Sequence, residues 1–220
     1  MKITSISAEI AAFQNDIQGI TALLGGTPAM REAGELYLPR FELEADKEYK
    51  KRLGVSTLTP YFEETVRGMN GRLFYKPADT SMVDDRILPT LDNFNLSGDN
   101  FAQLMESCSF EALATGRSWV VVDYYDAGAQ PFNAAQEQAL GARPYAYKVR
   151  SEQVMDVRYT DGNGLKRIRL FKYMHNVETD VNEFETKIEP EVVLFIDSEV
   201  RRYRKGESGW YLHDTRELRV

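Results

Sequence analysis

The stretch Leu113-Ala114-Thr115-Gly116-Arg117-Ser118-Trp119-Val120-Val121-Val122-Asp123 separates two halves of the chain that have different patterns. Before it, apolar residues recur at helical spacing, and Thr115-Gly116 ends the last predicted helix. From Ser118 to Tyr125 the residues form a continuous apolar run, typical of a strand buried on both faces. The sequence therefore predicts an α+β protein: an N-terminal helical layer with one buried strand, followed by an antiparallel β-rich segment.

Helical spacing predicts five helices upstream, at about 10–24, 28–36, 46–53, 60–73 and 99–115. Gly25-Gly26 ends the first helix, and Thr59 is the expected cap of the fourth, with Pro60 at its first position. The last two helices should pack on each other or on the strand. Their apolar faces are Phe62, Val66, Met69 and Leu73, and Phe101, Leu104, Met105, Cys108 and Ala112. Gly68 and Gly71 weaken the fourth helix and either admit a neighbouring backbone or are merely tolerated.

Period-two alternation predicts strands in the second half. Tyr145, Tyr147 and Val149 alternate, and a second alternating run leads into the hairpin turn Asp161-Gly162-Asn163-Gly164. The expected strands then cover 165–174, 191–197, 199–205 and 209–213. Such short strands suggest an antiparallel sheet or a small barrel. Residues 127–142 interrupt the pattern as a loop or a short helix.

Composition narrows the function classes. The 220 residues are 43% apolar and 28% charged, as in ordinary globular proteins. No apolar run approaches the roughly 20 residues of a membrane span, and the N-terminus lacks a signal-peptide core. The single cysteine, Cys108, excludes an internal disulfide and fits a reducing, cytosolic setting. The net charge of −7 argues against a basic surface that grips DNA.

No catalytic, cofactor-binding or metal-binding residues are predicted. Gly25-Gly26-Thr27-Pro28 lacks the Gly-Lys-Ser/Thr ending of a phosphate-binding loop. His175, His213 and Cys108 are too far apart in the sequence for a typical zinc motif. Cys108, on an apolar helix face, is predicted to be a buried structural thiol. We therefore expect no enzymatic activity and no cofactor.

Two pairs of carboxylates provide the enzymatic alternative. Asp123 and Asp126 end the buried strand, where Mg²⁺-dependent nucleases often carry their acids. Asp84-Asp85 lies in a predicted loop. The simpler interpretation is that all four are solvated strand or loop ends.

Basic residues alternate with aromatic ones at Arg167-Ile168-Arg169-Leu170-Phe171-Lys172-Tyr173 and again at Arg201-Arg202-Tyr203-Arg204-Lys205. On a strand, Arg167, Arg169, Phe171 and Tyr173 would share one face and could stack on nucleic acid. The favoured interpretation is a solvated sheet face whose charges pair across strands with Glu.

A set of short motifs occurs in one order along the chain. They are Gly25-Gly26, Met30-Arg31, Tyr37-Leu38-Pro39, Tyr49 with Arg52-Leu53, Gly71-Arg72 with Phe74 and Lys76-Pro77, and Gly116-Arg117 before Val121-Val122-Asp123. In this order and spacing the chain resembles the N-terminal half of tailed-bacteriophage portal proteins, over roughly residues 20–220.

The resemblance implies a structural protein of the virion. Portal proteins form rings, usually of twelve subunits, at one capsid vertex, and a separate terminase drives double-stranded DNA through the ring during packaging. The DNA later leaves through the same ring. Expected partners are other copies of the chain, terminase, and capsid or head–tail adaptor proteins, with DNA passing without sequence-specific binding and no membrane. Expected locations are the virion and, during assembly, the host cytoplasm.

The resemblance also implies a division of the chain. Residues 1–126 would form the helical part of the wing, 127–142 a loop, and 143–220 an antiparallel β segment that continues beyond the chain end. Family members are about twice as long, so the stem, clip, tunnel loop and crown are expected beyond residue 220, and the DNA-facing residues stay open. The alternatives are another virion protein, such as a head–tail adaptor, or the nuclease using Asp123 and Asp126.

Overall fold

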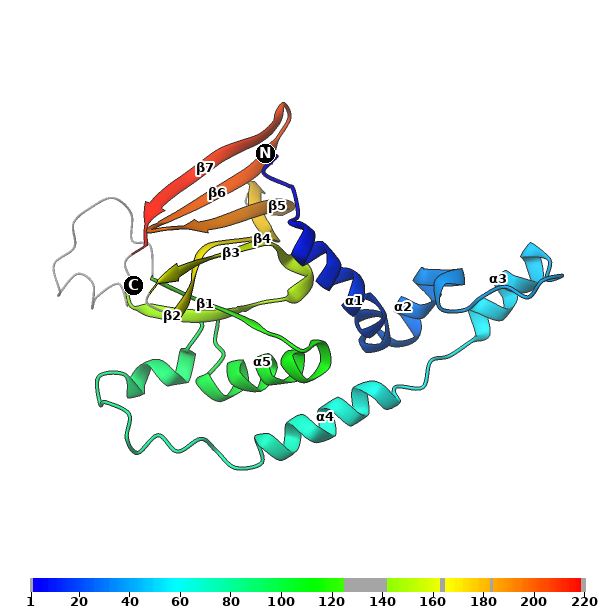
Figure 1. Ribbon diagram of the computed structural model, residues 1–220, viewed down its shortest axis with the longest axis horizontal. Helices are drawn as coiled ribbons and strands as arrows, with labels where there is room; N and C mark the ends of the chain where they lie inside the picture. Colours follow the sequence, from blue (N-terminus) through cyan, green and yellow to red (C-terminus); the bar gives the residue numbers. More distant parts are fainter. Residues whose placement is uncertain (1, 125–141, 163–164, 183, 219–220) are drawn as a thin grey trace.

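Helices occupy the N-terminal half of the computed structural model and antiparallel strands the C-terminal half, which confirms the predicted α+β class (Figure 1). The structure describes residues 2–124, 142–162, 165–182 and 184–218. The helices are α1 (Ala8–Leu24), α2 (Gly26–Ala33), α3 (Asp46–Val55), α4 (Tyr61–Leu73) and α5 (Phe101–Thr115), with 3-10 turns η1 (Gly34–Leu36), η2 (Leu88–Asn93) and η3 (Ser151–Gln153). The strands are β1 (Trp119–Tyr124), β2 (Pro144–Val149), β3 (Val154–Gly162), β4 (Leu165–Asn182), β5 (Glu185–Ile196), β6 (Glu199–Gly206) and β7 (Gly209–Glu217).

The strands form two antiparallel sheets. β1 pairs with β2, and β3 to β7 form a five-stranded meander in chain order. The main core lies between α1, the small sheet and the large sheet, and it includes Ile10, Val121, Val149, Phe171 and Val193. A smaller core joins α5 to β2 through Leu104, Cys108 and Ala146. Among the described residues, no helix has both the length and the apolar character needed to cross a bilayer.

Local sequence explains the boundaries of α5. Asn100 accepts a hydrogen bond from the Gln103 backbone, and the Gln103 side chain accepts one from the Asn100 backbone, so the helix begins with a capping box. It ends at Gly116, whose φ of 83° suits a residue without a Cβ. The predicted stop is therefore confirmed, and it directs the chain into β1.

Helix α4 differs from the prediction in two ways. It begins at Tyr61, and Pro60 rather than Thr59 occupies the cap position. Its packed side follows Val66 and Asn70, while Met69 and Leu73 are 50% and 63% exposed. The Asn70 amide can be buried because it donates to the backbone carbonyl of Glu106 in α5 (3.1 Å). The packing of α4 on α5 is thus confirmed, but half of its predicted apolar face is wrong.

The structure also bears on the predicted burial of β1 and on the two interpretations of Gly68 and Gly71. Strand β1 is not buried on both faces: Val120 and Val122 are 45% and 49% exposed, because β1 belongs to a two-stranded sheet whose outer face is uncovered. A Cβ added at Gly68 or Gly71 would meet no atom within 4 Å, so no described neighbour requires these glycines.

The β half follows the predicted order with longer strands. β4 and β5 continue to Asn182 and from Glu185, well past the expected ends, and their pairing was not predicted. Gly162 pairs with Leu165, which agrees with the predicted hairpin. The interruption expected at 127–142 falls mostly on residues 125–141, which lie outside the described part of the chain.

Candidate functional site

Asp123 is the candidate metal ligand of the nuclease alternative. It is 1% exposed in β1, so its interpretation as a solvated strand end is wrong, and its carboxylate already has partners. Arg216 of β7 forms an ion pair with Oδ2, and the Tyr145 hydroxyl donates to the same oxygen (3.3 Å). The backbone N–H of Tyr124 donates to Oδ1 (2.8 Å). The Asp123–Arg216 pair therefore joins the edges of the two sheets. A carboxylate in this environment is suited to holding strands together.

The other predicted acids do not join Asp123 in the described structure. Asp126 lies outside the described residues, and Asp84 forms an exposed ion pair with Arg86 (2.8 Å). Within the described ranges, no group of three or more His, Cys, Asp or Glu side chains is arranged to hold a metal ion. The nuclease alternative thus has one of its two ligands engaged by Arg216 and the other without a described position.

A polar pocket of about 410 Å³ lies between the small sheet and the large sheet, beside Asp123. Its walls are formed by β1, β2, β4, β5 and β6 together with the loop at Asn95 and Ser97. The titratable and charged groups that line it are Asp123, Tyr145, Tyr147, Lys148, Tyr173, His175, Glu191, Arg202 and Arg204. Sequence reasoning did not predict this cluster, because its members come from five strands whose register is set only on folding.

Two hydrogen-bonded tyrosines line this pocket. The Tyr147 and Tyr173 hydroxyls are hydrogen-bonded to each other (2.8 Å). Burial raises the pKa of Tyr173 to about 12 and raises the pKa of Tyr147 above that of an exposed phenol. Both phenols therefore stay protonated at neutral pH, where neither can serve as a general base.

Glu191 is the centre of an ionic triad across three strands. His175 of β4 lies 3.3 Å from Oε1, and Arg204 of β6 donates from Nε to Oε2 (2.8 Å). Burial opposes ionisation of Glu191, but the hydrogen bonds from His175 and Arg204 outweigh it and lower its pKa to about 2. Glu191 is thus a permanent anion that clamps β4, β5 and β6, and its protonation state is unsuited to acid catalysis near neutrality.

On β4, both interpretations of the face shared by Arg169, Phe171 and Tyr173 are wrong for its aromatic part, which is neither solvated nor free to stack. Phe171 and Tyr173 are buried in the main core, so they cannot stack on nucleic acid. Arg169 is exposed and lies 3.5 Å from Asp197, while the side chain of Arg167 is outside the described part. The cause is the large sheet itself, because the face that carries the aromatic rings covers the core.

The second basic stretch follows the favoured interpretation in part. Arg204 pairs with Glu191 across strands, and Arg201 pairs with Glu199 on its own strand (2.7 Å). Cys108 also behaves as predicted: it is buried, and burial raises the pKa of its thiol.

Two motifs of the N-terminal half, Tyr37-Leu38-Pro39 and Tyr49 with Arg52, are hydrogen-bonded to each other. They belong to a projecting arm, defined here as residues 26–58, which extends from the end of α1 (Figure 1). The Tyr49 hydroxyl donates to the carbonyl of Leu38 (3.1 Å), and Arg52 donates to the carbonyl of Pro39 (2.8 Å). Arg52 also holds Glu44 through two hydrogen bonds of 2.7 Å. Two motifs that are separate in the sequence thus fold into one unit.

Two further hydrogen bonds complete the arm. Arg31 donates to the carbonyl of Ser56 (2.9 Å), and Thr27 accepts from the backbone N–H of Leu58 (2.9 Å). Both bonds connect α2 to the segment that follows α3. The polar residues of this region thus hold α2, the loop at 38–44 and α3 together.

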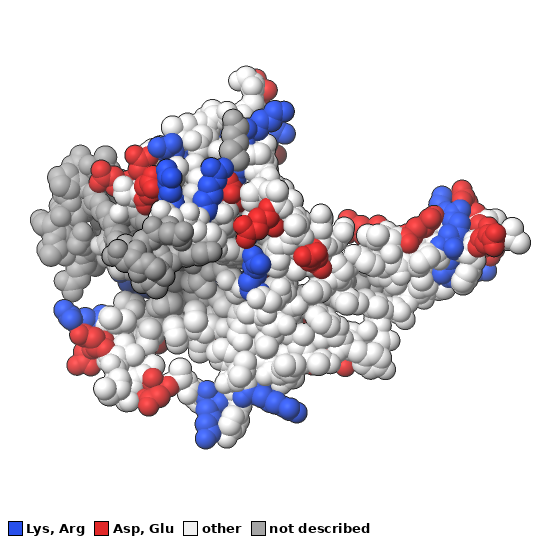
Figure 2. Space-filling model, viewed as in Figure 1, with Lys and Arg blue, Asp and Glu red and all other residues white. Residues whose placement is uncertain are grey.

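The arm presents apolar side chains to solvent. Leu43 is 97% exposed, and the other large exposed ones on the arm and the start of α4 are Leu36, Tyr37, Phe41, Val55 and Tyr61. Figure 2 shows charge at the far end of the arm and little along its middle. Exposed apolar side chains gathered on one projection are typical of surfaces that contact other proteins.

Comparisons with protein-family models and with curated proteins find no match to this chain.

Proposed function

We propose that this chain is the wing-type body of a tailed-bacteriophage portal protein, a structural subunit of the ring at the capsid vertex through which double-stranded DNA is packaged and ejected. The observation that carries the proposal is the arm. Two of the motifs quoted above for their resemblance to portal proteins, at residues 37–39 and 49–52, are hydrogen-bonded to each other in the arm, which also carries exposed apolar side chains.

The shape of the arm supports assembly rather than an independent monomer. A rigid projection with exposed Leu43 and Val55 presents apolar surface that a partner would cover. In a cyclic assembly each subunit must offer two different patches, one to each neighbour. A projecting arm and the body behind it provide two such regions. The proposed first partner is therefore another copy of the chain, in a ring that is a dodecamer in the full-length form.

The polar pocket supports a role without catalysis. Its carboxylates Asp123 and Glu191 are held by Arg216, His175 and Arg204. The net charge of −7 suits a ring past which DNA moves without being gripped. The proposal includes terminase and capsid or head–tail adaptor proteins as further partners. It places the protein in the virion, and in the host cytoplasm during assembly, with no membrane partner.

The test is electron microscopy of the protein expressed from the full coding sequence that contains this chain. We expect rings with a central channel wide enough for duplex DNA, and copurification with terminase when the two are coexpressed. Leu43→Ser on the arm should reduce the fraction of rings, whereas Met82→Ser, equally exposed outside the arm, is the matched control. Monomers without rings would refute the proposal, and rings that bind preassembled portals but no terminase would favour a head–tail adaptor.

A further inference from the structure

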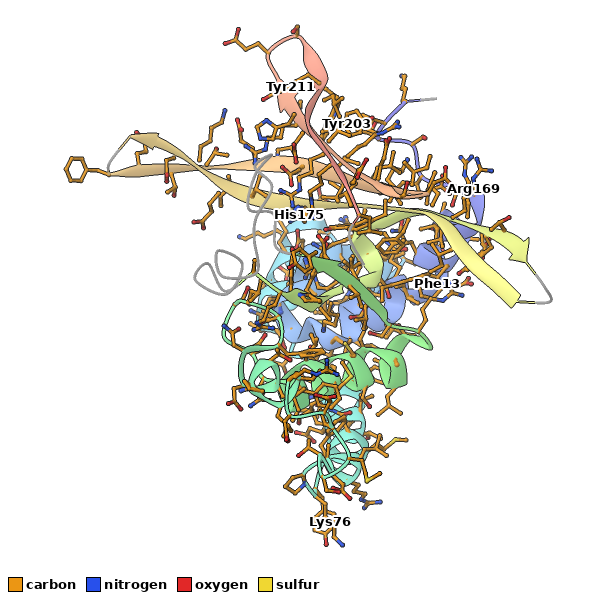
Figure 3. The ribbon with its side chains drawn as sticks, turned by 90° about the vertical axis from the view of Figure 1, so that its left-hand side faces the viewer. Phe13, Lys76, Arg169, His175, Tyr203 and Tyr211 are labelled. Carbon is orange, nitrogen blue, oxygen red and sulfur yellow. The ribbon has the colours of Figure 1, made fainter. Side chains whose placement is uncertain are left out.

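The β4–β5 hairpin extends beyond the sheet to which it belongs. β3 pairs with β4 no further than Tyr173, and β6 pairs with β5 only from Glu191 onward. Residues 176–182 and 185–190 therefore pair only with each other, and we call this part the ribbon. Figure 3 shows the ribbon projecting to one side of the molecule. A two-stranded ribbon is marginally stable in water, so this length of unsupported hairpin suits a segment that another surface holds.

The ribbon carries exposed apolar residues to its tip. Phe184, at the turn, is 95% exposed. Ile188 pairs with Glu178 and is also exposed, on the same ribbon face as the exposed Met174. A phenylalanine buries on the order of 150–250 Å² when a partner covers it. The tip thus presents one large anchor with an apolar side chain behind it.

An apolar socket lies elsewhere on the body. It has a volume of about 120 Å³ and is lined by Trp119, Val120, Val121, Ile168, Phe171 and Phe195. Val120 and Ile168 are about half exposed at its rim. A closed apolar cavity of about 150 Å³ binds a benzene molecule. The socket therefore suits a single aromatic side chain inserted from outside.

The ribbon of a molecule points away from the socket of the same molecule. Ile168 and the end of β4 at Asn182 are separated by 14 residues of strand, about 45 Å at roughly 3.3 Å per residue. In Figure 3 the ribbon and the β3–β4 hairpin, beside Arg169, extend in opposite directions. Insertion of the tip into a socket therefore requires a second copy of the chain.

The charges around the two surfaces are complementary. The described side chains of the ribbon include Glu178, Asp180, Glu185 and Glu189 against the single cation Lys187. The guanidinium of Arg117 lies 6.0 Å from the ring centroid of Trp119 in the socket wall, and the exposed Arg169 follows Ile168. Asp197 offsets Arg169 at 3.5 Å, so Arg117 leaves the rim with a net positive charge. Two acidic ribbons repel each other, whereas this rim attracts a ribbon, which favours docking of the ribbon on the body.

We infer that the ribbon of one copy docks on the body of the next, with Phe184 seated in the socket formed by Trp119, Val120, Ile168 and Phe195. The contact joins two different surfaces, so it propagates head to tail and can close into a ring. One aromatic anchor buries far less than the roughly 1,000 Å² of a stable interface, so the contact is weak in isolation. The inference extends the proposed function by naming one subunit contact.

The test places the photo-reactive p-azidophenylalanine at position 184, which keeps a single phenyl ring there. After irradiation at high protein concentration, mass spectrometry should locate the cross-links in dimers on residues 119–121, 168 or 195 of the other copy. The same amino acid at Tyr211, an exposed position on β7, is the control and should give few such links. Cross-links from 184 to 184, to other surfaces, or none at all would overturn the inference.

A second experiment tests which copy supplies the socket. Copies with the photo-reactive residue at position 184 are mixed with labelled partner copies that lack it. A partner carrying Val120→Glu should accept at least about tenfold fewer cross-links from position 184, since burying the anchor is worth that factor or more. Ile168→Glu is the second, independent variant, and circular dichroism confirms that each variant is folded. Unchanged cross-linking to both folded variants contradicts the socket. Rings without socket cross-links would refute only this contact, whereas socket cross-links in a protein that forms no rings would refute only the portal proposal.

Discussion

The ammonium group of Lys172 donates a hydrogen bond of 2.5 Å to the backbone carbonyl of Ser5 and another of 3.2 Å to that of Ile3. Lys172 is buried in β4, and burial lowers its pKa. The backbone N–H of Ser7 continues the attachment by donating to Met155 of β3 (2.8 Å). A buried charge thus fastens the segment that leads into α1.

Replacing Lys172 by methionine should release this segment. The carbonyls of Ile3 and Ser5 lose their hydrogen-bond donor. A buried acceptor without a donor costs about 1–3 kcal/mol, which raises the equilibrium constant for local opening roughly 5- to 150-fold. Hydrogen exchange of the amides at 5–11 should accelerate by that factor, while the substitution Lys187→Met at an exposed position should leave the exchange rate unchanged.

The lowered pKa of Lys172 also predicts a pH dependence. Between its pKa in the folded protein and the ordinary value of 10.5, Lys172 is more often protonated in the unfolded chain than in the folded one. The wild type should therefore gain stability relative to Lys172→Met as pH rises toward 10.5.

The Glu191 triad should make the fold sensitive to acid. The folded pKa of about 2 lies below the ordinary 4.5, so the stabilisation is fully present above pH 4.5 and is lost as pH falls toward 2. The loss amounts to roughly 3 kcal/mol. Urea midpoints between pH 2 and 7 should fall more steeply in the wild type than in Glu191→Gln. Glu178→Gln, an exposed change on β4, should keep the wild-type slope, and parallel curves for all three proteins would contradict the assignment.

The fold class followed from local signals, and the errors arose where a neighbouring element decides burial. The stop at Gly116 was predictable because its left-handed backbone conformation favours glycine. The hairpin near Gly162 was predictable because Asp-Gly and Asn-Gly pairs are common turn signals between alternating strands. The exposure of Val122 was not, because a continuous apolar run looks the same in a covered and an uncovered sheet. The pocket was not predictable either, since His175, Glu191 and Arg204 meet only when three strands take one register.

Asp123 should matter for stability and not for cleavage. Asp123→Asn removes the charge of the buried carboxylate that pairs with Arg216, which should lower the free energy of unfolding by about 3–5 kcal/mol. Asp197→Asn removes an exposed pair and should cost about 0–1 kcal/mol. The wild type should not cut plasmid DNA in Mg²⁺. Mg²⁺-dependent cleavage that disappears in Asp123→Asn would instead establish the nuclease alternative.

The smaller core should depend on one leucine of α5. Leu104 is 4% exposed beside Cys108 and Ala146, so Leu104→Ala should cost about 2–5 kcal/mol in urea denaturation. Leu113→Ala, on the same helix but 38% exposed, should cost clearly less. An unchanged midpoint for Leu104→Ala would show that α5 does not pack as described.

The 220-residue chain alone should not form a stable ring. The described contact surfaces are the arm and a single-anchor socket, and the latter buries far less than the roughly 1,000 Å² that specific interfaces need. In the family that the sequence resembles, long stem and crown helices supply further ring contacts.

We therefore expect monomers or weak oligomers at micromolar concentration, with a mass near 25.2 kDa by light scattering coupled to gel filtration. Ribbon docking should appear only as a rise in average mass with concentration, and Val120→Glu should suppress that rise. A single stable species near twelve times the monomer mass would mean that these 220 residues close a ring by themselves. In that case the arm and the ribbon must bury far more surface between copies than one aromatic anchor can, and the expectation of a weak contact would be wrong.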